Sequence, residues 1–313
     1  MSLKAYISFV ELPTKIASII PFIMGIAYSL YRYNVADIVN LIIMFVSMIT
    51  FDMTTTAINN YCDYKNELKH SSEKYNGKNP MFVYNISENV GLLTIFILLT
   101  TAIITGIILS LKTNLLVLLI GIICFFVGIF YTFGPIPISR MPLGEIFSGI
   151  FMGFIIPFLT IYVSTYDRGY FGIYIDNYVI LARFNIIEII TILLVTVPLI
   201  GGIANIMLAN NICDLEEDIK VGRYTLPYYI GKKISINLFK YIYYFGYIAI
   251  LLSIFIDILP KISILTILSL YIVQKNIIKF EEKQIKSQTF INSVKNFTFI
   301  GLSYVISIFV SFI

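Results

Sequence analysis

The chain has 313 residues, of which 58% are hydrophobic and 13% are charged, and its mean hydropathy is +0.88. Soluble domains are about half apolar and about one quarter charged, so this composition excludes an ordinary soluble protein and predicts an all-α, polytopic membrane protein. The net charge of +4 does not indicate nucleic-acid binding, because the basic residues lie in short loops between apolar runs. Three cysteines and the single histidine, His70, predict neither a disulfide framework nor a zinc site.

The apolar runs approach the length of about 20 residues that a membrane-spanning helix needs. We expect nine spans, at 12–31, 38–60, 90–111, 114–133, 143–164, 186–210, 237–257, 260–277 and 293–313. Residues 2–11 predict a short interfacial helix, and no signal-peptide cleavage site follows it. The segments 63–89 and 214–236 are expected to be long polar loops on one side of the membrane. The 165–185 loop is expected on the other side.

The distribution of basic residues predicts the orientation of these helices. If all nine cross, the N-terminus and the loops after the even-numbered spans share one side, which holds seventeen of the 22 Lys and Arg residues. Such an excess marks the cytoplasmic side. We therefore expect a single domain, 1–313, in the cell (plasma) membrane, with its active site facing the cytoplasm.

Two similar motifs, at 59–67 and 210–218, share the pattern N-N-x-C-D-x-x-x-(E/D), and each ends a long apolar run. Both follow an even-numbered span, which indicates a parallel internal repeat. Residues four apart lie on one face of a helix, so each motif predicts one polar stripe. The stripes consist of Asn59, Asp63 and Glu67, and of Asn210, Asp214 and Asp218. A single acidic pair at a helix end is usually a solvated terminus, whereas two matched copies favour a function.

The four carboxylates of these stripes repel one another unless cations lie between them. Carboxylate and amide oxygens suit Mg²⁺, which is commonly shared with substrate phosphates. We therefore predict that Asp63, Glu67, Asp214 and Asp218 are metal ligands with a catalytic role. Lys65, Lys69, Lys220 and Arg223 are expected to neutralise phosphate charge, and Asn59, Asn60, Asn210 and Asn211 to orient carboxylates or bind phosphate oxygens. The expected chemistry is metal-assisted departure of diphosphate from a long-tailed substrate, which leaves an allylic cation for an acceptor to attack.

Asp52 lies inside the second predicted span, eleven residues before Asp63, which is close to three helical turns. It therefore shares the face of the first stripe. Two interpretations stay open: a contact to a polar acceptor substrate, or a protonated or hydrogen-bonded packing residue. The Lys275–Lys286 loop is interpreted as an anchor to anionic lipid and not as part of the site.

Two stretches carry a resemblance to a known family. The run N-N-I-C-D-L-E-E-D-I-K-V-G-R-Y-T-L-P at 210–227 is similar to the N-N-x-x-D-x-E-x-D-x-x-x-G-[KR]-x-T-L run of the MenA-type branch of the UbiA superfamily of intramembrane aromatic prenyltransferases. The proline-punctuated run at 131–145 is similar to the Y-T-x-G-P-x-P-x-x-x-x-P-x-G-E run of the same branch, and it carries Arg140 and Glu145 close to the predicted site.

This resemblance implies a nine-helix bundle with a central cavity open to the cytoplasmic face and to the membrane. It also implies transfer of a chain from polyprenyl diphosphate to an aromatic acceptor, with Mg²⁺ and without an obligate protein partner. In the MenA-type branch the acceptor is 1,4-dihydroxy-2-naphthoate, which loses its carboxylate and gives demethylmenaquinone. The residues expected to contact substrate are Asn59, Asn60, Lys65, Lys69, Tyr131, Arg140, Asn210, Asn211, Lys220, Arg223 and Asp52.

Two features of the first motif depart from the pattern of the family: Asn60 stands where the family usually has Asp, and Glu67 replaces the last Asp. The 67–80 loop also lacks the Gly-Thr-Asp pattern usual in the MenA-type branch, and its Asn79-Pro80 pair resembles the loop of other branches. Other acceptors (4-hydroxybenzoate, homogentisate or a glycerol phosphate) therefore remain alternatives. A cation-coupled transporter is a further alternative, but its acids are expected mid-span and not at helix ends beside basic loops.

Overall fold

The computed structural model describes residues 1–69, 79–132, 137–220 and 222–312. His70 and residues 133–136 of the proline-punctuated run lie outside the described residues. The chain divides into two compact units, the first made of residues 1–16 and 42–137 and the second of residues 17–41 and 138–313. Each unit is considered separately below, and the single-domain assignment stays a prediction.

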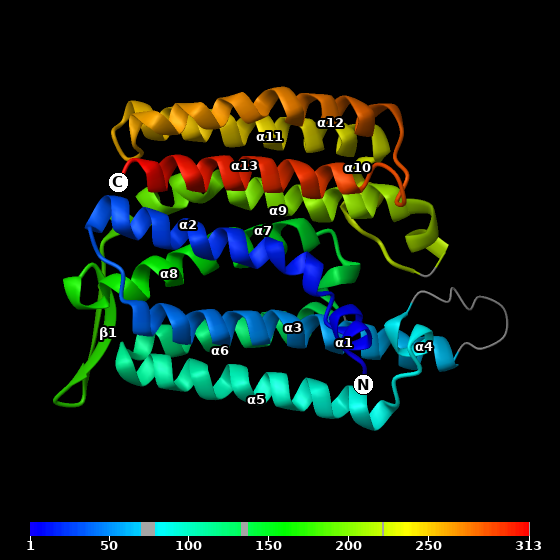
Figure 1. The fold of residues 1–313 in the computed structure, drawn as a ribbon, viewed down its shortest axis with the longest axis horizontal. Helices are drawn as coiled ribbons and strands as arrows, with labels where there is room; N and C mark the ends of the chain where they lie inside the picture. The colour runs from blue at the N-terminus through cyan, green and yellow to red at the C-terminus, as the bar shows by residue number, and fades with distance from the viewer. Residues whose placement is uncertain (70–78, 133–136, 221, 313) are drawn as a thin grey trace. The chain divides into compact units, whose positions relative to one another are not determined.

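The first unit is built around α3, which carries the first motif (Figure 1). Its elements are α1 (Leu3–Phe9), η1 (Leu12–Lys15), α3 (Ile38–Lys69, from residue 42), α4 (Pro80–Val83), α5 (Glu88–Lys112) and α6 (Leu115–Thr132). Ser47 Oγ on α3 donates to the Ala102 carbonyl of α5 over 3.0 Å. Phe51 of α3 stacks on Phe125 of α6 with ring centroids 4.2 Å apart. A hydroxyl and an aromatic pair therefore join α3 to both of its long neighbours.

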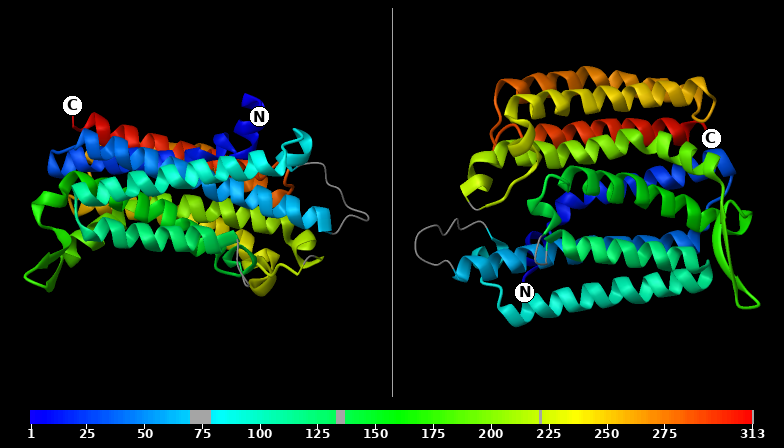
Figure 2. Two further views of the ribbon diagram at one scale, coloured as in Figure 1. Left: turned by 90° about the horizontal axis from the view of Figure 1, so that it is seen from below. Right: turned by 180° about the vertical axis from the view of Figure 1, so that it is seen from behind.

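The second unit is built around α9, which carries the second motif. Its elements are α2 (Ile16–Tyr33, from residue 17), η2 (Ile138–Arg140), α7 (Gly144–Ile150), η3 (Phe151–Ile155), α8 (Ile156–Thr165), η4 (Tyr166–Arg168), β1 (Phe171–Asp176), β2 (Val179–Phe184), α9 (Ile186–Lys220), α10 (Leu226–Ile230), α11 (Lys232–Phe255), η5 (Lys261–Ser269), α12 (Leu270–Glu282) and α13 (Ile291–Val310). Both Figure 1 and Figure 2 show α9, α11, α12 and α13 running side by side.

Small residues let α9 pack closely against its neighbours in this unit. A Cβ added at Gly153, in the π-helical turn η3, would lie 2.5 Å from Ile200 Cα, and one added at Gly202 would lie 2.7 Å from the Phe297 ring. Close backbone approach of this kind is the usual packing mode of helices in membranes. The buried Asn205 amide also donates to the Phe239 carbonyl of α11 over 2.8 Å. These contacts hold α9, and therefore its motif, in a fixed place within the second unit.

The predicted helical fold is confirmed. Among the described residues, eight helices are long and apolar enough to cross a membrane, and the remaining predicted span, the fourth, corresponds to α6, whose apolar stretch Leu115–Tyr131 is shorter. The short helix predicted at 2–11 is present as α1, and its place at the membrane interface stays a prediction. The fifth and eighth predicted spans are each interrupted helices, because η3 is π-helical and η5 is 3₁₀-helical.

The two motif helices continue beyond the ends that we predicted for their spans. α3 has 32 residues and α9 has 35, so they are about 48 and about 52 Å long, whereas the hydrocarbon core of a bilayer is about 30 Å thick. The residues 63–69 and 214–220, predicted as loop, are helical, because they contain neither Gly nor Pro and include good helix formers. Both motifs therefore lie entirely on helices, as the spacing of their polar residues requires.

The connection at 165–185, which we predicted only as a loop, contains a β-hairpin that the sequence analysis did not identify. β1 and β2 form an antiparallel hairpin in which Asp176 pairs with Val179. The two turn residues, Asn177 and Tyr178, both have positive φ angles, of 46° and 65°, as the common two-residue hairpin turn requires. Tyr is a rare choice at such a position, so the sequence lacks the usual Asn-Gly signal.

Candidate active site

Asp218, the last acid of the second motif, is paired with Arg223 in the turn that follows α9. Asp218 lies in the last turn of α9 and is 5% exposed. Gly222, with a φ of 69°, turns the chain back, so that the Arg223 N–H donates to the Asp218 carbonyl over 2.9 Å. The Arg223 guanidinium lies 3.5 Å from Asp218 Oδ1, and its Nε donates to the Ser139 carbonyl over 2.9 Å. The turn after α9 therefore fixes a cation beside a buried carboxylate.

The part of the proline-punctuated run that belongs to the second unit, residues 138–145, lies against this motif, as expected for Arg140 and Glu145. The Tyr224 N–H donates to the Arg140 carbonyl over 3.3 Å, while the Arg140 side chain is exposed. The Asn211 amide donates to Glu145 Oε1 over 2.8 Å, and these two residues are 1% and 4% exposed. A buried amide thus joins α9 to α7.

Lys286 brings a second cation to the same motif. It lies between α12 and α13, and its ammonium contacts both Asn210 Oδ1 and Asp214 Oδ2. The interpretation of the Lys275–Lys286 loop as a lipid anchor does not account for this contact. Nothing local in the sequence indicates it, because Lys286 is separated by 72 residues from Asp214.

Several oxygen atoms in this motif, and one on the neighbouring helix α7, are buried and lack a hydrogen-bond partner. They are Asp218 Oδ2, Asn211 Oδ1 and Glu145 Oε2. Carboxylate and amide oxygens without a proton donor suit a hard cation such as Mg²⁺. Within the described part of the chain, no group of three or more His, Cys, Asp or Glu side chains is arranged to hold a metal ion. One or two carboxylates per ion, completed by water and phosphate, is the usual arrangement for Mg²⁺.

In the first motif, Asn60 is part of the packing between helices. Its side-chain amide donates to the Phe9 backbone carbonyl of α1 over 2.9 Å, and its backbone carbonyl accepts from the Asn79 side-chain amide over 2.9 Å. Asn79 in turn caps α4 by accepting from the Met81 N–H over 2.9 Å. Asn60 is 7% exposed, and it ties α3 to α1 and α4. Its predicted contact to substrate stays a prediction.

The acids of the first motif differ from each other in burial. Asp63 is exposed, whereas Glu67 is half-buried, and its Oε2 is buried without a hydrogen-bond partner. Asn59, on the same face of α3, is half-buried. Lys65 does not point to these acids, because its ammonium lies 3.0 Å from Glu88 at the start of α5. Glu67 thus offers the first unit an oxygen comparable to Asp218 Oδ2.

The other residues that we predicted to contact substrate are distributed over both units. Tyr131 is half-buried in the last turn of α6, in the first unit. Lys69 ends α3, and its side chain lies outside the described residues. Lys220 ends α9 in the second unit, with an exposed side chain. The roles predicted for these three residues stay predictions.

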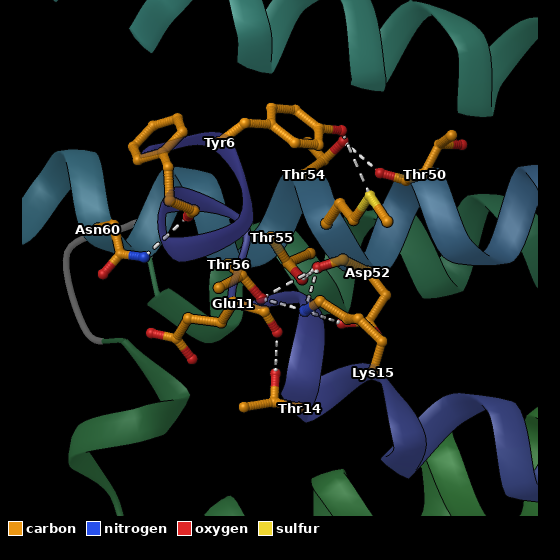
Figure 3. A network of polar contacts seen from close by, with 12 residues as sticks. Tyr6, Glu11, Thr14, Lys15, Thr50, Asp52, Thr54, Thr55, Thr56 and Asn60 are labelled. Carbon is orange, nitrogen blue, oxygen red and sulfur yellow. Dashed lines mark hydrogen bonds and ion pairs between the residues drawn. The ribbon is translucent and has the colours of Figure 1, made fainter. Parts of the chain in front are cut away.

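The buried Lys15 forms an ion pair with the half-buried Asp52, and sequence reasoning missed this pair (Figure 3). The Lys15 ammonium is 2.7 Å from Asp52 Oδ1, 3.1 Å from the Asp52 carbonyl and 2.6 Å from Thr56 Oγ1. Lys15 is 2% exposed and lies at the end of η1. This pair agrees with the interpretation of Asp52 as a hydrogen-bonded packing residue, and a contact of Asp52 to an acceptor substrate stays a prediction. The signal in the sequence that could have indicated the pair was Lys15 itself, a basic residue at the start of the first predicted span.

Known proteins show both sequence and fold similarity to this chain. It is 27% identical to the 1,4-dihydroxy-2-naphthoate octaprenyltransferase of Bacillus subtilis (strain 168) over 225 residues. This matched stretch is 72% of this chain and 65% of that protein. The match thus spans slightly less than two thirds of the relative's length.

Two solved structures share the fold. The apo UbiA homologue from Aeropyrum pernix K1 has a TM-score of 0.68 at 15% identity, and the UbiA homologue from Archaeoglobus fulgidus bound to GPP and Mg²⁺ has a TM-score of 0.60 at 14% identity. Each covers 98% of both chains. The model of the UbiA prenyltransferase family matches residues 18–296. The chain belongs to the UbiA prenyltransferase family.

Proposed function

We propose that this protein transfers a polyprenyl chain from polyprenyl diphosphate to 1,4-dihydroxy-2-naphthoate, with Mg²⁺, at the cytoplasmic face of the cell membrane. The observation that carries the proposal is the environment of Asp218. One of its carboxylate oxygens faces the Arg223 guanidinium, and the other is buried without a partner. A carboxylate that faces a fixed cation and has a free oxygen suits a site for a metal ion and a phosphate together.

The residues expected to hold Mg²⁺ are Asp63, Glu67, Asp214 and Asp218. The ion, when bound, neutralises charge on the diphosphate and so favours its departure. Arg223 is oriented by Ser139 and Asp218, and its guanidinium is a planar donor suited to phosphate oxygens. It would stabilise the negative charge that develops as the bond between the allylic carbon and the diphosphate oxygen breaks, with the electron pair leaving on the oxygen.

The acceptor ring then attacks the allylic carbon. In the proposed reaction the new carbon–carbon bond forms at the ring carbon that bears the carboxylate, and that group leaves as CO₂. The naphthoate is favoured over the other acceptors by the named function of the Bacillus subtilis relative and by the resemblance of the 131–145 run. The other prenyl acceptors (4-hydroxybenzoate, homogentisate and a glycerol phosphate) form the comparison set for the experiment.

The test uses membranes that contain the full chain, Mg²⁺, polyprenyl diphosphates of several lengths and each of the four acceptors. We expect a prenylated naphthohydroquinone from the wild-type protein, measured as the naphthoquinone after oxidation in air, and little from Asp214→Asn. Glu217→Gln is the matched control, because Glu217 is an exposed acid of the same helix outside the stripe. If the naphthoate gives no product and Asp214→Asn behaves as the wild type does with every acceptor, the assignment is wrong. Ion flux in proteoliposomes without prenyl transfer would support the transporter instead.

A further inference from the structure

The turn that carries Lys286 is a closed local structure. It connects α12 to α13, and the Thr289 N–H donates to the Ile285 carbonyl over 2.8 Å. The Thr289 hydroxyl accepts from the Ile285 N–H over 2.9 Å. The Gln284 amide also donates to the Phe280 carbonyl over 2.6 Å. These bonds fix the backbone on both sides of Lys286, so its side chain starts from a defined position.

The Lys286 ammonium contacts two residues of the second stripe that are one helical turn apart, Asn210 and Asp214. The exposed fraction of the side chain is 48% for Lys286 and 20% for Asp214. A contact to two stripe residues at once differs from an ordinary surface pair, in which one lysine meets one acid. Lys283, three residues earlier in the same connection, has an exposed side chain, and its backbone N–H donates to the Lys279 carbonyl at the end of α12.

The contact sets up a competition at Asp214. The same carboxylate oxygen cannot hold both an ammonium ion and Mg²⁺ at close range, because the two cations repel each other. A lysine has a flexible four-carbon stem with a compact charge at its end, and this one is half-exposed, so it can move by several ångströms without disturbing the turn. A diphosphate beside Asp214 offers the displaced ammonium a new anionic partner.

We propose that Lys286 is a further diphosphate-binding residue, which neutralises Asp214 before the substrate arrives and moves to a phosphate oxygen when Mg²⁺ and the diphosphate bind. The inference rests on the proposed function, since it needs a diphosphate at the second motif. It assigns the α12–α13 connection to the substrate site in addition to the two motif helices. Substrate binding and release of Asp214 are then coupled through a single side chain.

The test measures binding to the purified full chain in a neutral detergent, by titration calorimetry. The two ligands are Mg²⁺ alone and, in the presence of Mg²⁺, a geranyl diphosphate analogue with a thiolo bridge that cannot ionise readily. The variants are Lys286→Gln, Lys286→Arg and the matched control Lys283→Gln. We expect Lys286→Gln to bind the analogue about tenfold more weakly, because one charged hydrogen bond is lost. It should bind Mg²⁺ alone about threefold more tightly, because the competing ammonium is gone.

Lys286→Arg should bind the analogue within about threefold of the wild type, and Lys283→Gln should match the wild type with both ligands. Opposite changes in the two affinities distinguish this role from a loss of folding, which weakens both. If Lys286→Gln leaves either affinity unchanged, or lowers both, the inference is wrong. A lipid phosphate is the alternative partner of Lys286. In that case Lys286→Gln would bind both ligands as the wild type does in lipid-free detergent, and added anionic lipid would strengthen binding by the wild type but not by Lys286→Gln. That result would also overturn the inference. If the wild-type chain does not bind the analogue, the proposed function itself fails.

Discussion

The two motif copies have the same local pattern but different surroundings. In both, the second Asn is buried and its amide donates to another element, Asn60 to the Phe9 carbonyl and Asn211 to Glu145. The acids differ. In the second copy Asp214 and Asp218 each meet a cation, whereas the lysine within the first copy is paired with Glu88. The repeat therefore preserves the helix and its structural amide, and the counter-ions come from segments outside the motif.

We propose from this difference that the two copies have different roles in substrate binding. Lys286 and Arg223 gather positive charge at the second copy, which suits the binding of phosphate. Glu67, with its unpartnered buried oxygen, suits the binding of a metal ion in the first copy. Four expected outcomes sharpen or break this comparison, from the largest effect to the smallest.

The largest effect on stability is expected at Lys15, whose buried ammonium forms an ion pair with Asp52 within the first unit. Lys15→Met should lower the free energy of unfolding by about 3–5 kcal/mol, because it leaves the Asp52 carboxylate without its counter-ion. Thermal unfolding in detergent, calibrated against denaturant, measures the loss. Lys15→Met with Asp52→Leu should recover most of it, since no buried charge then remains. Equal stability of the single and double variants would show that the pair does not brace this unit.

The next effect concerns catalysis at the second copy. Asp218→Asn should reduce kcat/KM for prenyl transfer by about 100-fold, which corresponds to about 2.7 kcal/mol of transition-state stabilisation. Glu67→Asp should keep most of the activity, because it restores the family's residue and retains a carboxylate. Glu217→Gln serves as the control in the same assay. Unchanged turnover in Asp218→Asn contradicts the role of this carboxylate.

The buried amides should matter for stability in both copies. Asn60→Ala and Asn211→Ala should each lower the free energy of unfolding by about 1–3 kcal/mol, because each leaves a buried acceptor without its donor. Asn66→Ala, an exposed position on α3, is the matched control. A chemical-denaturation series on the three variants compares them directly. An Asn60 variant as stable as the control would remove the structural parallel between the copies.

The smallest effect is expected for the exposed pair of Lys65 and Glu88. Both side chains are about two fifths exposed, so water and salt screen their attraction. A double-mutant cycle with Lys65→Ala and Glu88→Ala should give only a small coupling in stability, which vanishes in high salt. A coupling that is larger and independent of salt would mean that Glu88, too, belongs to the framework of the first copy.

The helices and the motifs could be predicted because both depend on patterns within a single segment. Apolar runs locate the spans, and a spacing of four residues locates the stripes. The ends of α3 and α9 were misjudged because their last turns are polar, and hydropathy carries no signal there. Lys15 and Lys286 could not be assigned their partners, since those contacts join residues 37 and 72 positions apart. The turn residue Tyr178 concealed the hairpin in the same way, because its conformation is imposed by the paired strands.

The length of α9 has one further consequence. Asp218 and Gly202 belong to one helix and are separated by sixteen residues, or roughly 24 Å along its axis. Gly202 is the point at which this helix touches the Phe297 ring. The helix therefore fixes the distance between Asp218 at its acidic end and the tight contact at Gly202 near its middle. Because the Phe297 ring of α13 already fills the space beside Gly202, any larger side chain at this position must push α13 away from α9, at a fixed distance along the helix from Asp218.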